Sequence, residues 1–212
     1  NNPWPAIHVH YRNLTQAHFR AVRYDWEKLL SQENYSPGVM TPQLRDELVA
    51  RKPDLAWTHD LPATKDYLPA TQSFTVPDKL QPGFYLLLAS PDEDFGDTDN
   101  VVLANEFWVS PLAIVLRTGG KAAEAEGFVL DADTGEPLAG AQVRVWTMKR
   151  DVRRARWTEG KSVRTDKNGL FRVQGTANEP YAVLVKHGKH ALATGSERYA
   201  YRNYEDPQSR EQ

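Results

Sequence analysis

Two turn signals in the second half of the chain constrain its fold more than any other feature. Residues 127–143 read GFVLDADTGEPLAGAQV and residues 165–171 read TDKNGLF. Each segment places a glycine, Gly135 or Gly169, close to an apolar run. Glycine readily takes the positive φ that tight turns require, and Asp and Asn bond the turn backbone. The pattern therefore predicts short antiparallel strands joined by tight turns.

The rest of this half continues in the same way. Strands are expected at residues 112–116, 126–131, 142–148, 155–165, 170–174, 181–187 and 191–194. About seven strands are typical of a small β-sandwich. We place a domain boundary at Ser110-Pro111, because proline interrupts strand pairing and a fresh apolar strand follows at once. The second domain then spans residues 111–204, with an edge strand at 199–202 and a frayed tail at 205–212.

Residues 1–110 predict another sandwich. Ile7, Val9 and Tyr11 alternate with polar residues, which is typical of a strand with one buried face. Residues 18–24 follow as its hairpin partner. Three further strands are expected at residues 74–76, 84–89 and 101–109, and the second of these is apolar enough for a central strand.

A helical insertion at residues 25–52 interrupts these strands. Asp25 is expected to cap a short turn of helix, and Thr41-Pro42 has the cap-then-proline order of a second helix start. Leu44 and Leu48 then share one face until Pro53 ends the pattern. The predicted fold is thus all-β: two tandem antiparallel β-sandwiches of immunoglobulin-like architecture, with a short helical insertion in the first.

Five segments, taken in order, resemble consecutive macroglobulin-like domains of bacterial alpha-2-macroglobulins. They are YRN at 11–13, FRAVRYDWEKLL at 19–30, PGFYLL at 82–87, FWVSPLA at 107–113 and DTGEPLAGA at 133–141. The last segment also resembles carboxypeptidase-regulatory-like and other transthyretin-like sandwiches, so either kind fits the second domain.

The resemblance implies a large exported protein that traps proteases. In such proteins a protease cuts a bait segment, the body collapses around it, and in many members a Cys-Gln thioester captures it. This chain has no Cys, hence no thioester, and no bait segment is recognisable. The resemblance therefore implies non-catalytic scaffold domains, whose partners are neighbouring domains of the parent chain and, through the intact parent, host or foreign proteases.

The resemblance also implies a periplasmic or extracellular location, or tethering to a membrane through the parent chain. The chain starts at Asn1 with neither an initiator Met nor a signal-peptide pattern, which indicates a piece of a longer protein. Its net charge of −2 and pI near 6.3 provide no basic footprint for nucleic acid. No apolar run approaches the ~20 residues of a spanning helix, so we expect no direct membrane insertion.

The acidic loop at residues 91–100 holds the best metal candidates. Asp92, Asp94, Asp97 and Asp99 supply the carboxylate oxygens that calcium prefers. Their spacing is not that of an EF-hand, so we interpret the segment as a solvated hairpin loop and expect no metal.

Two histidines and four turn residues are weaker candidates. His8 and His10 share a strand face, as zinc ligands do, but without an obvious third ligand the pair predicts an ordinary solvated face. The four turn residues are Asp131, Asp133, Asp166 and Asn168. We expect their side chains to hydrogen-bond the backbone of their own turns rather than to ligate a metal ion through oxygen.

One basic cluster stands out at residues 149–156, which read KRDVRRAR. Such a cluster could bind an anionic surface, a lipid headgroup or nucleic acid. Asp151 interrupts it and the whole chain is slightly acidic, so we favour a solvated hairpin loop.

Five of the six tryptophans divide into two groups. Trp108 and Trp146 lie in expected strands and are predicted to be core residues. Trp4, Trp57 and Trp157 lie in looser regions and are predicted to line a domain interface, with a sugar-stacking platform as the alternative.

Catalytic motifs are missing from the sequence: it has no Gly-x-Ser-x-Gly elbow, no phosphate-binding glycine loop and no His-Glu-x-x-His. We expect no enzyme activity and no cofactor. The alternative function is a carbohydrate-binding or adhesin-type cell-surface module.

Overall fold

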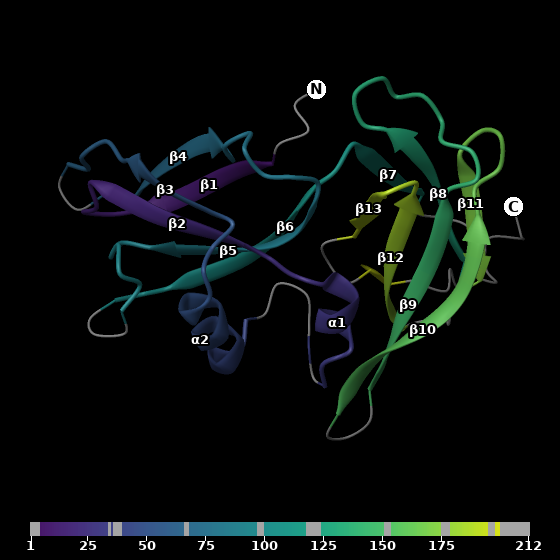
Figure 1. Ribbon diagram of the computed structural model, residues 1–212, viewed down its shortest axis with the longest axis horizontal. Coiled ribbons are helices and arrows are strands. Elements are labelled where there is room, and N and C mark those ends of the chain that lie inside the picture. Colours follow the sequence, from purple (N-terminus) through teal and green to yellow (C-terminus); the bar gives the residue numbers. More distant parts are fainter. Residues whose placement is uncertain are drawn as a thin grey trace, which may run out of the picture. The chain divides into compact units, whose positions relative to one another are not determined.

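The computed structural model describes residues 5–33, 35, 40–65, 68–96, 100–117, 124–150, 154–174, 179–194 and 198–199 (Figure 1). Two compact units make up the chain. Unit 1 comprises Asn1–Leu29 and Ser36–Pro111, and unit 2 comprises Leu30–Tyr35 and Leu112–Gln212. The polypeptide therefore crosses between the units three times. The short segment Leu30–Tyr35, which lies within the helical insertion expected for the first domain, belongs to unit 2.

Unit 1 is an antiparallel sandwich of two sheets, ordered β1-β4 and β3-β2-β5-β6. Its elements are β1 Ala6–Tyr11, β2 Gln16–Arg23, α1 Trp26–Leu30, α2 Pro42–Ala50, β3 Leu55–Asp60, β4 Ala70–Thr75, β5 Gly83–Ser90 and β6 Leu103–Val109. The facing side chains form a core rich in aromatic rings. Phe19 stacks on Trp57 with ring centroids 5.2 Å apart and meets Phe74 edge-on at 5.4 Å.

The hairpin predicted between the first two strands is wrong. β1 pairs with β4, so that Tyr11 lies opposite Ala70, whereas β2 pairs with β3 and β5. Tyr11 and Phe19 enter one core from opposite sheets, and a hairpin would have placed both side chains in one sheet. Strand β3, not expected from the sequence, is only half-buried, with inward side chains alternating with exposed ones.

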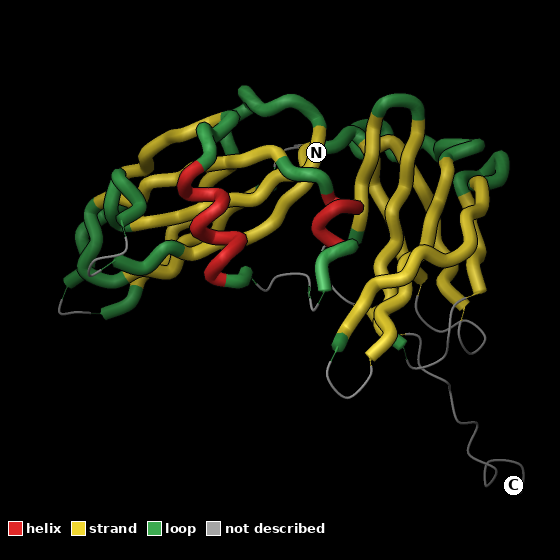
Figure 2. The backbone as a smooth tube through the Cα atoms, turned by 60° about the horizontal axis from the view of Figure 1, so that its bottom comes forward, coloured by secondary structure: helices red, strands yellow, loops and turns green. Residues whose placement is uncertain are grey.

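The helical insertion forms as predicted. Asp25 accepts a hydrogen bond from the backbone N–H of Lys28 at 3.0 Å at the start of α1, and Thr41 accepts one from Leu44 at 3.2 Å at the start of α2. Figure 2 shows α2 lying across the four-stranded sheet of unit 1. This cover explains why the apolar strand β5 is buried along most of its length on both faces. Among the described residues, no helix has the length and apolar character needed to span a membrane.

Unit 2 is the second antiparallel sandwich, with sheets ordered β11-β8-β7 and β10-β9-β12-β13 and with β14 paired to β12. Its strands are β7 Leu112–Arg117, β8 Glu124–Asp131, β9 Gln142–Arg150, β10 Ala155–Arg164, β11 Leu170–Gln174, β12 Pro180–His187, β13 His190–Ala193 and β14 Arg198–Tyr199. Valines from both sheets dominate the core, among them Val129, Val143, Val173, Val183 and Val185.

The predicted fold class is confirmed. Strand pairing is antiparallel throughout the described part of the chain, and each unit encloses a core between two sheets. In unit 2 the strands expected before residue 195 are all present, with ends shifted by a few residues. Most of the expected edge strand at 199–202 and the whole expected tail at 205–212 lie outside the described residues.

Candidate functional site

The carboxylate of Asp131 organises a turn. Its Oδ1 accepts hydrogen bonds from the backbone N–H of Thr134 at 2.9 Å and of Asp133 at 3.0 Å. These two donors, in that order, hold the pKa of Asp131 below its ordinary value. Gly135 follows with a φ of +75°. The turn interpretation of this segment is confirmed.

The second predicted turn has the same chemistry. Asp166 Oδ1 accepts hydrogen bonds from the backbone N–H of Asn168 at 2.8 Å and of Leu170 at 2.9 Å. Gly169 has a φ of +72°, and a Cβ there would lie 2.5 Å from the carbonyl oxygen of Val129. The turn therefore packs against β8 too closely for any side chain at position 169.

The acidic loop is anchored by its own contacts. Asp92 Oδ1 accepts a hydrogen bond from the backbone N–H of Asp94 at 3.1 Å. Phe95 is buried, and the guanidinium of Arg20 lies 4.1 Å from its ring centroid. The other two calcium candidates, Asp97 and Asp99, lie outside the described residues.

The histidine pair lies on the exposed face of β1. His8 is opposite Ser73, and His10 Nδ1 lies 2.8 Å from the hydroxyl oxygen of Thr71. Within the residues that the structure describes, no group of three or more His, Cys, Asp or Glu side chains is placed to hold a metal ion. The expectation of no metal stays a prediction.

Two tryptophans expected at an interface or a sugar platform lie instead inside their own units. Trp57 is in β3 and stacks on Phe19. Trp157 is buried in β10, where its indole N–H donates to the backbone carbonyl of Tyr35 at 3.1 Å. Strand β3, which contains Trp57, is not expected from the sequence, and the hydrogen-bond partner of Trp157 is distant along the chain. Trp4 lies outside the described residues.

Of the two tryptophans expected in the core, Trp146 is buried in unit 2. Trp108 is half-buried in unit 1, where its ring centroid lies 5.1 Å from that of Phe84 and 6.3 Å from that of Trp26. Trp146 is therefore a core residue, as predicted, whereas Trp108 is only half-buried and packs against these aromatic neighbours.

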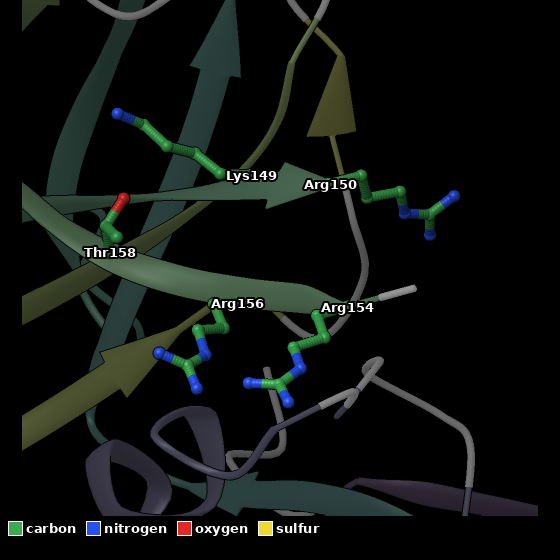
Figure 3. A pocket seen from close by; sticks show the side chains of 5 residues that line it. All are labelled: Lys149, Arg150, Arg154, Arg156 and Thr158. Atoms are coloured by element: carbon green, nitrogen blue, oxygen red, sulfur yellow. The ribbon is translucent and has the colours of Figure 1, made fainter. Parts of the chain in front are cut away.

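The basic cluster forms a recess at one end of the β9–β10 hairpin (Figure 3). Its volume is about 310 Å³, and the lining side chains are Lys149, Arg150, Arg154, Arg156 and Thr158. The interpretation of residues 149–156 as a loop is therefore wrong for much of the segment, because β9 extends through Arg150 and β10 begins at Ala155. Residues 151–153 lie outside the described part of the chain. We call this feature the basic recess.

Strand register determines which side chains of the basic recess share a face. Lys149 is directly opposite Arg156, and the adjacent pair is Met148 and Trp157. Met148 and Trp157 are 1% and 6% exposed. Because successive side chains of a strand point to opposite faces, these two buried residues hold Lys149 and Arg156 on the outer face.

A carboxylate distant in sequence enters the basic recess. Glu33 Oε1 lies 3.0 Å from Arg156 Nη2 and 3.4 Å from Arg154 Nε. Together with the hydrogen bond from Trp157 to Tyr35, these ion pairs attach the segment Leu30–Tyr35 to β10 within unit 2. No local sequence pattern relates Glu33 to arginines more than a hundred residues away, so its role is visible only in the structure.

Comparison with solved structures identifies the fold. A fragment of native alpha-2-macroglobulin from Escherichia coli spanning domains NIE-MG1 matches with a TM-score of 0.60 and 13% identity, over 91% of this chain and 91% of that fragment. A longer fragment of the same protein spanning MG0-NIE-MG1 matches with a TM-score of 0.64 and 13% identity, over 91% of this chain and 59% of that fragment. No protein-family profile matches the sequence, nor does any curated protein at a significant level. The resemblance predicted from the five segments is thus confirmed for the fold.

Proposed function

We propose that this chain supplies two non-catalytic scaffold domains to a bacterial alpha-2-macroglobulin-like protein that traps proteases. One observation carries the proposal: a single NIE-MG1 fragment matches across both units, and the match covers 91% of each chain. A likeness confined to one sandwich would be weak support, because sandwiches serve many functions. In this proposal unit 1 corresponds to the NIE domain and unit 2 to MG1, and the boundary between them in the chain lies near Ser110-Pro111.

The use of polar side chains in the two units supports a scaffold role. The hydroxyl of Thr165 donates to the carbonyl of Leu138 at 2.6 Å and accepts from the N–H of Ala141 at 2.9 Å. The hydroxyl of Tyr85 donates to the carbonyl of Gln81 at 2.7 Å, and burial raises the pKa of Tyr85. These groups satisfy turn backbone and hold the sandwich ends together, which is the work of a rigid support.

The proposal includes a location and partners. The parent protein is exported to the periplasm or the cell exterior, where neighbouring domains of the same chain pack against these units. Proteases are engaged by the intact parent rather than by this chain. Any thioester lies elsewhere in the parent, since this chain has no Cys.

The test uses the full-length parent protein. It is mixed with trypsin or elastase, with and without methylamine, and analysed on native gels and by intact mass. A compact species that retains the protease supports the proposal, and loss of covalent retention after methylamine treatment indicates a thioester in the parent. Degradation to small fragments with no retained protease would contradict the proposal, and a glycan array would then test the surface-module alternative.

The 212-residue chain is the matched control. As a scaffold it should leave the rate at which trypsin cleaves a protein substrate unchanged. In the parent, Lys161→Gln on the exposed part of β10 should leave trapping unchanged, while a core truncation such as Phe19→Ala should lower it only as far as it lowers the folded fraction. Inhibition by the isolated chain would count against a purely supporting role.

A further inference from the structure

The described strands of unit 1 repeat those of unit 2 with one strand missing. Matched in chain order, β1 to β6 correspond to β8 to β13 (Figure 1). The pairing of β1 with β4 then matches that of β8 with β11, and the order β3-β2-β5-β6 matches β10-β9-β12-β13. Strand β7, which pairs with β8, has no counterpart in the part of unit 1 that the structure describes.

Strand β7 indicates what such a counterpart would do. It runs antiparallel to β8, on the edge of β8 that faces away from β11. Alternate side chains of β7 belong to the core of unit 2 or pack against it, and they are Leu112, Ile114 and Leu116. The equivalent place in unit 1 is the edge of β1 that faces away from β4.

The backbone groups along this edge of β1 are available for pairing. On the other edge, the carbonyl oxygen of Pro5 accepts a hydrogen bond from the N–H of Val76 at 3.1 Å. Because the direction of hydrogen bonding alternates along an antiparallel strand, the odd-numbered residues of β1 direct their backbone groups at β4. The even-numbered residues direct theirs at the free edge, and they are Ala6, His8 and His10. No described strand pairs there, and β1 has no Pro, charged side chain or bulge that would block pairing.

Apolar surface is left uncovered beside this edge, on the core side of β6. Tyr85 and Ala89 of β5 contribute to the core, and their partners on β6 are Phe107 and Leu103. Side chains of directly paired residues lie on one face of a sheet, so both partners are on the core side. Phe107 is half-buried, but Leu103 is 64% exposed. In unit 2, β7 lies close to β13, the counterpart of β6. A strand beside β1 would therefore cover this surface.

Burial of the matched strands β1 and β8 differs in the way that a missing neighbour explains. Val129, on the core side of β8, is completely buried. Ile7 and Val9, on the core side of β1, are only half-buried. Strand β8 has a neighbour on each edge, whereas β1 has one among the described strands.

We propose that the free edge of β1 binds an extended segment of the parent polypeptide from outside the described residues. The segment adds a strand antiparallel to β1 and completes the sandwich of unit 1. Backbone hydrogen bonds to the even-numbered residues of β1 supply affinity, and alternate apolar side chains directed at Leu103 and Phe107 supply specificity.

A single strand fits this place better than a second copy of the chain. Unit 2 covers the equivalent region with the 6 residues Leu112–Arg117, whereas a second copy would bring a whole sandwich to it. The proposal goes beyond protease trapping, because it depends on strand topology alone. Failure of the trypsin and elastase assay would therefore leave it unaffected.

The first experiment tests whether the edge is free. Amide exchange is measured by NMR on the isotopically labelled 212-residue chain. The N–H groups of Ala6, His8 and His10 should exchange at least about tenfold faster than those of Ile7, Val9 and Tyr11. Equal protection of both sets in the dilute monomer would overturn the proposal, because the edge would already be occupied. Protection that appears only as the chain dimerises would identify a second copy as the occupant and would also overturn it.

The second experiment supplies a strand of the stated chemistry. A copy of Leu112–Arg117, LAIVLR, is fused upstream of Asn1 through a Gly-Ser linker, which raises its effective concentration at β1. Exchange at Ala6, His8 and His10 should slow about tenfold, and the melting temperature should rise. The control fusion carries serine in place of the two leucines and the isoleucine of the added copy, and it should have little effect. No slowing with LAIVLR, or equal slowing with both fusions, would overturn the proposal.

One pair of variants locates the effect within the LAIVLR fusion. Leu103→Asp puts a charge on the core side of β6 and should remove most of the slowing at β1. It should leave the unfused chain folded, because Leu103 is largely exposed. The matched control is Val115→Asp in unit 2, which changes another exposed apolar strand residue and should preserve the slowing. Equal loss in both variants would count against the edge of β1 as the site, and melting temperatures verify that each variant is folded.

Discussion

Units 1 and 2 share one architecture but assemble it from strands of very different separation in the sequence. In unit 2, β7 pairs with β8, β9 with β10, and β12 with β13, so most strands have a sequence neighbour beside them. In unit 1, β1 pairs with β4, and Tyr11 meets Ala70. Unit 2 also contains distant pairings, β8 with β11 and β9 with β12, but the separation is greatest in unit 1. The comparison teaches that sequence neighbours account for part of each sandwich, and that only a shared core can select the distant pairings.

The two cores also differ in the side chains that fill them. Unit 2 fills its interior with valines of similar shape, while unit 1 relies on contacts between a few aromatic rings. In unit 1 the ring of Phe19 touches Trp57 and Phe74, which come from two different sheets. A single aromatic residue thus joins the strands that the turns do not connect.

The largest effect is expected from truncating one aromatic residue in each core. Phe19→Ala in unit 1 and Phe171→Ala in unit 2 remove side chains that are 1% and 2% exposed. Each should lower the free energy of unfolding by about 3 to 5 kcal/mol through lost burial and a cavity. Denaturant unfolding combined with hydrogen exchange mass spectrometry measures the total and locates it. Each variant should lose protection mainly in its own unit, and equal loss in both units would contradict separate cooperative cores.

A smaller effect tests the role of the turns in unit 2. Gly169→Ala forces a positive φ on alanine and places Cβ 2.5 Å from the carbonyl oxygen of Val129, so the loss should be roughly 3 kcal/mol. The control is Gly135→Ala, which has a φ of +75° but no atom within 4 Å of the added Cβ and should lose only about 1 kcal/mol. Denaturation midpoints compare the two. Equal losses would show that strain alone, and not the packing of the turn on β8, matters.

The segment that unit 2 takes from the first half of the chain gives the third test. Trp157→Phe removes the donor to the Tyr35 carbonyl and should cost about 1 kcal/mol. Exchange of the amides in residues 30–35 should become faster. Trp57→Phe is the control, because its buried indole N–H has no partner among the described residues and only packing is changed. Unchanged exchange in Trp157→Phe would contradict the anchoring role of this hydrogen bond.

The smallest effect concerns pH. The hydrogen bond from Arg172, together with Arg117, holds the pKa of Glu126 below its usual value of 4.5. As pH falls, the unfolded chain therefore binds a proton at this position before the folded chain does, and the stabilisation present above pH 4.5 is lost as pH passes through the folded pKa.

Glu126→Gln should flatten this part of the stability profile between about pH 5 and pH 3. Urea unfolding at several pH values measures the slope for both proteins. The difference should shrink in high salt, since the carboxylate and the two arginines are partly exposed. An unchanged slope would show that the ion pairs are not maintained in solution.

The basic recess shows which features of a candidate site can be predicted from the sequence and which cannot. The cations of residues 149–156 are visible in the sequence, but the interruption by Asp151 and the slightly acidic charge of the whole chain favour a solvated hairpin loop. The structure extends both strands, and the register then places Lys149 against Arg156. Glu33 was beyond reach of the sequence, since its approach depends on the packing of Leu30–Tyr35 in unit 2.

Local features were determined by the sequence itself: the turns at Gly135 and Gly169, the helix starts at Asp25 and Thr41, and the alternation along β1. Each depends on backbone conformation and on hydrogen bonds within a few residues, so interactions between neighbouring residues are enough to stabilise it. The tertiary structure alone decided that β1 pairs with β4, and that Glu33 approaches β10. Such choices depend on which apolar faces share a core, and that free energy is distributed over residues far apart in the chain.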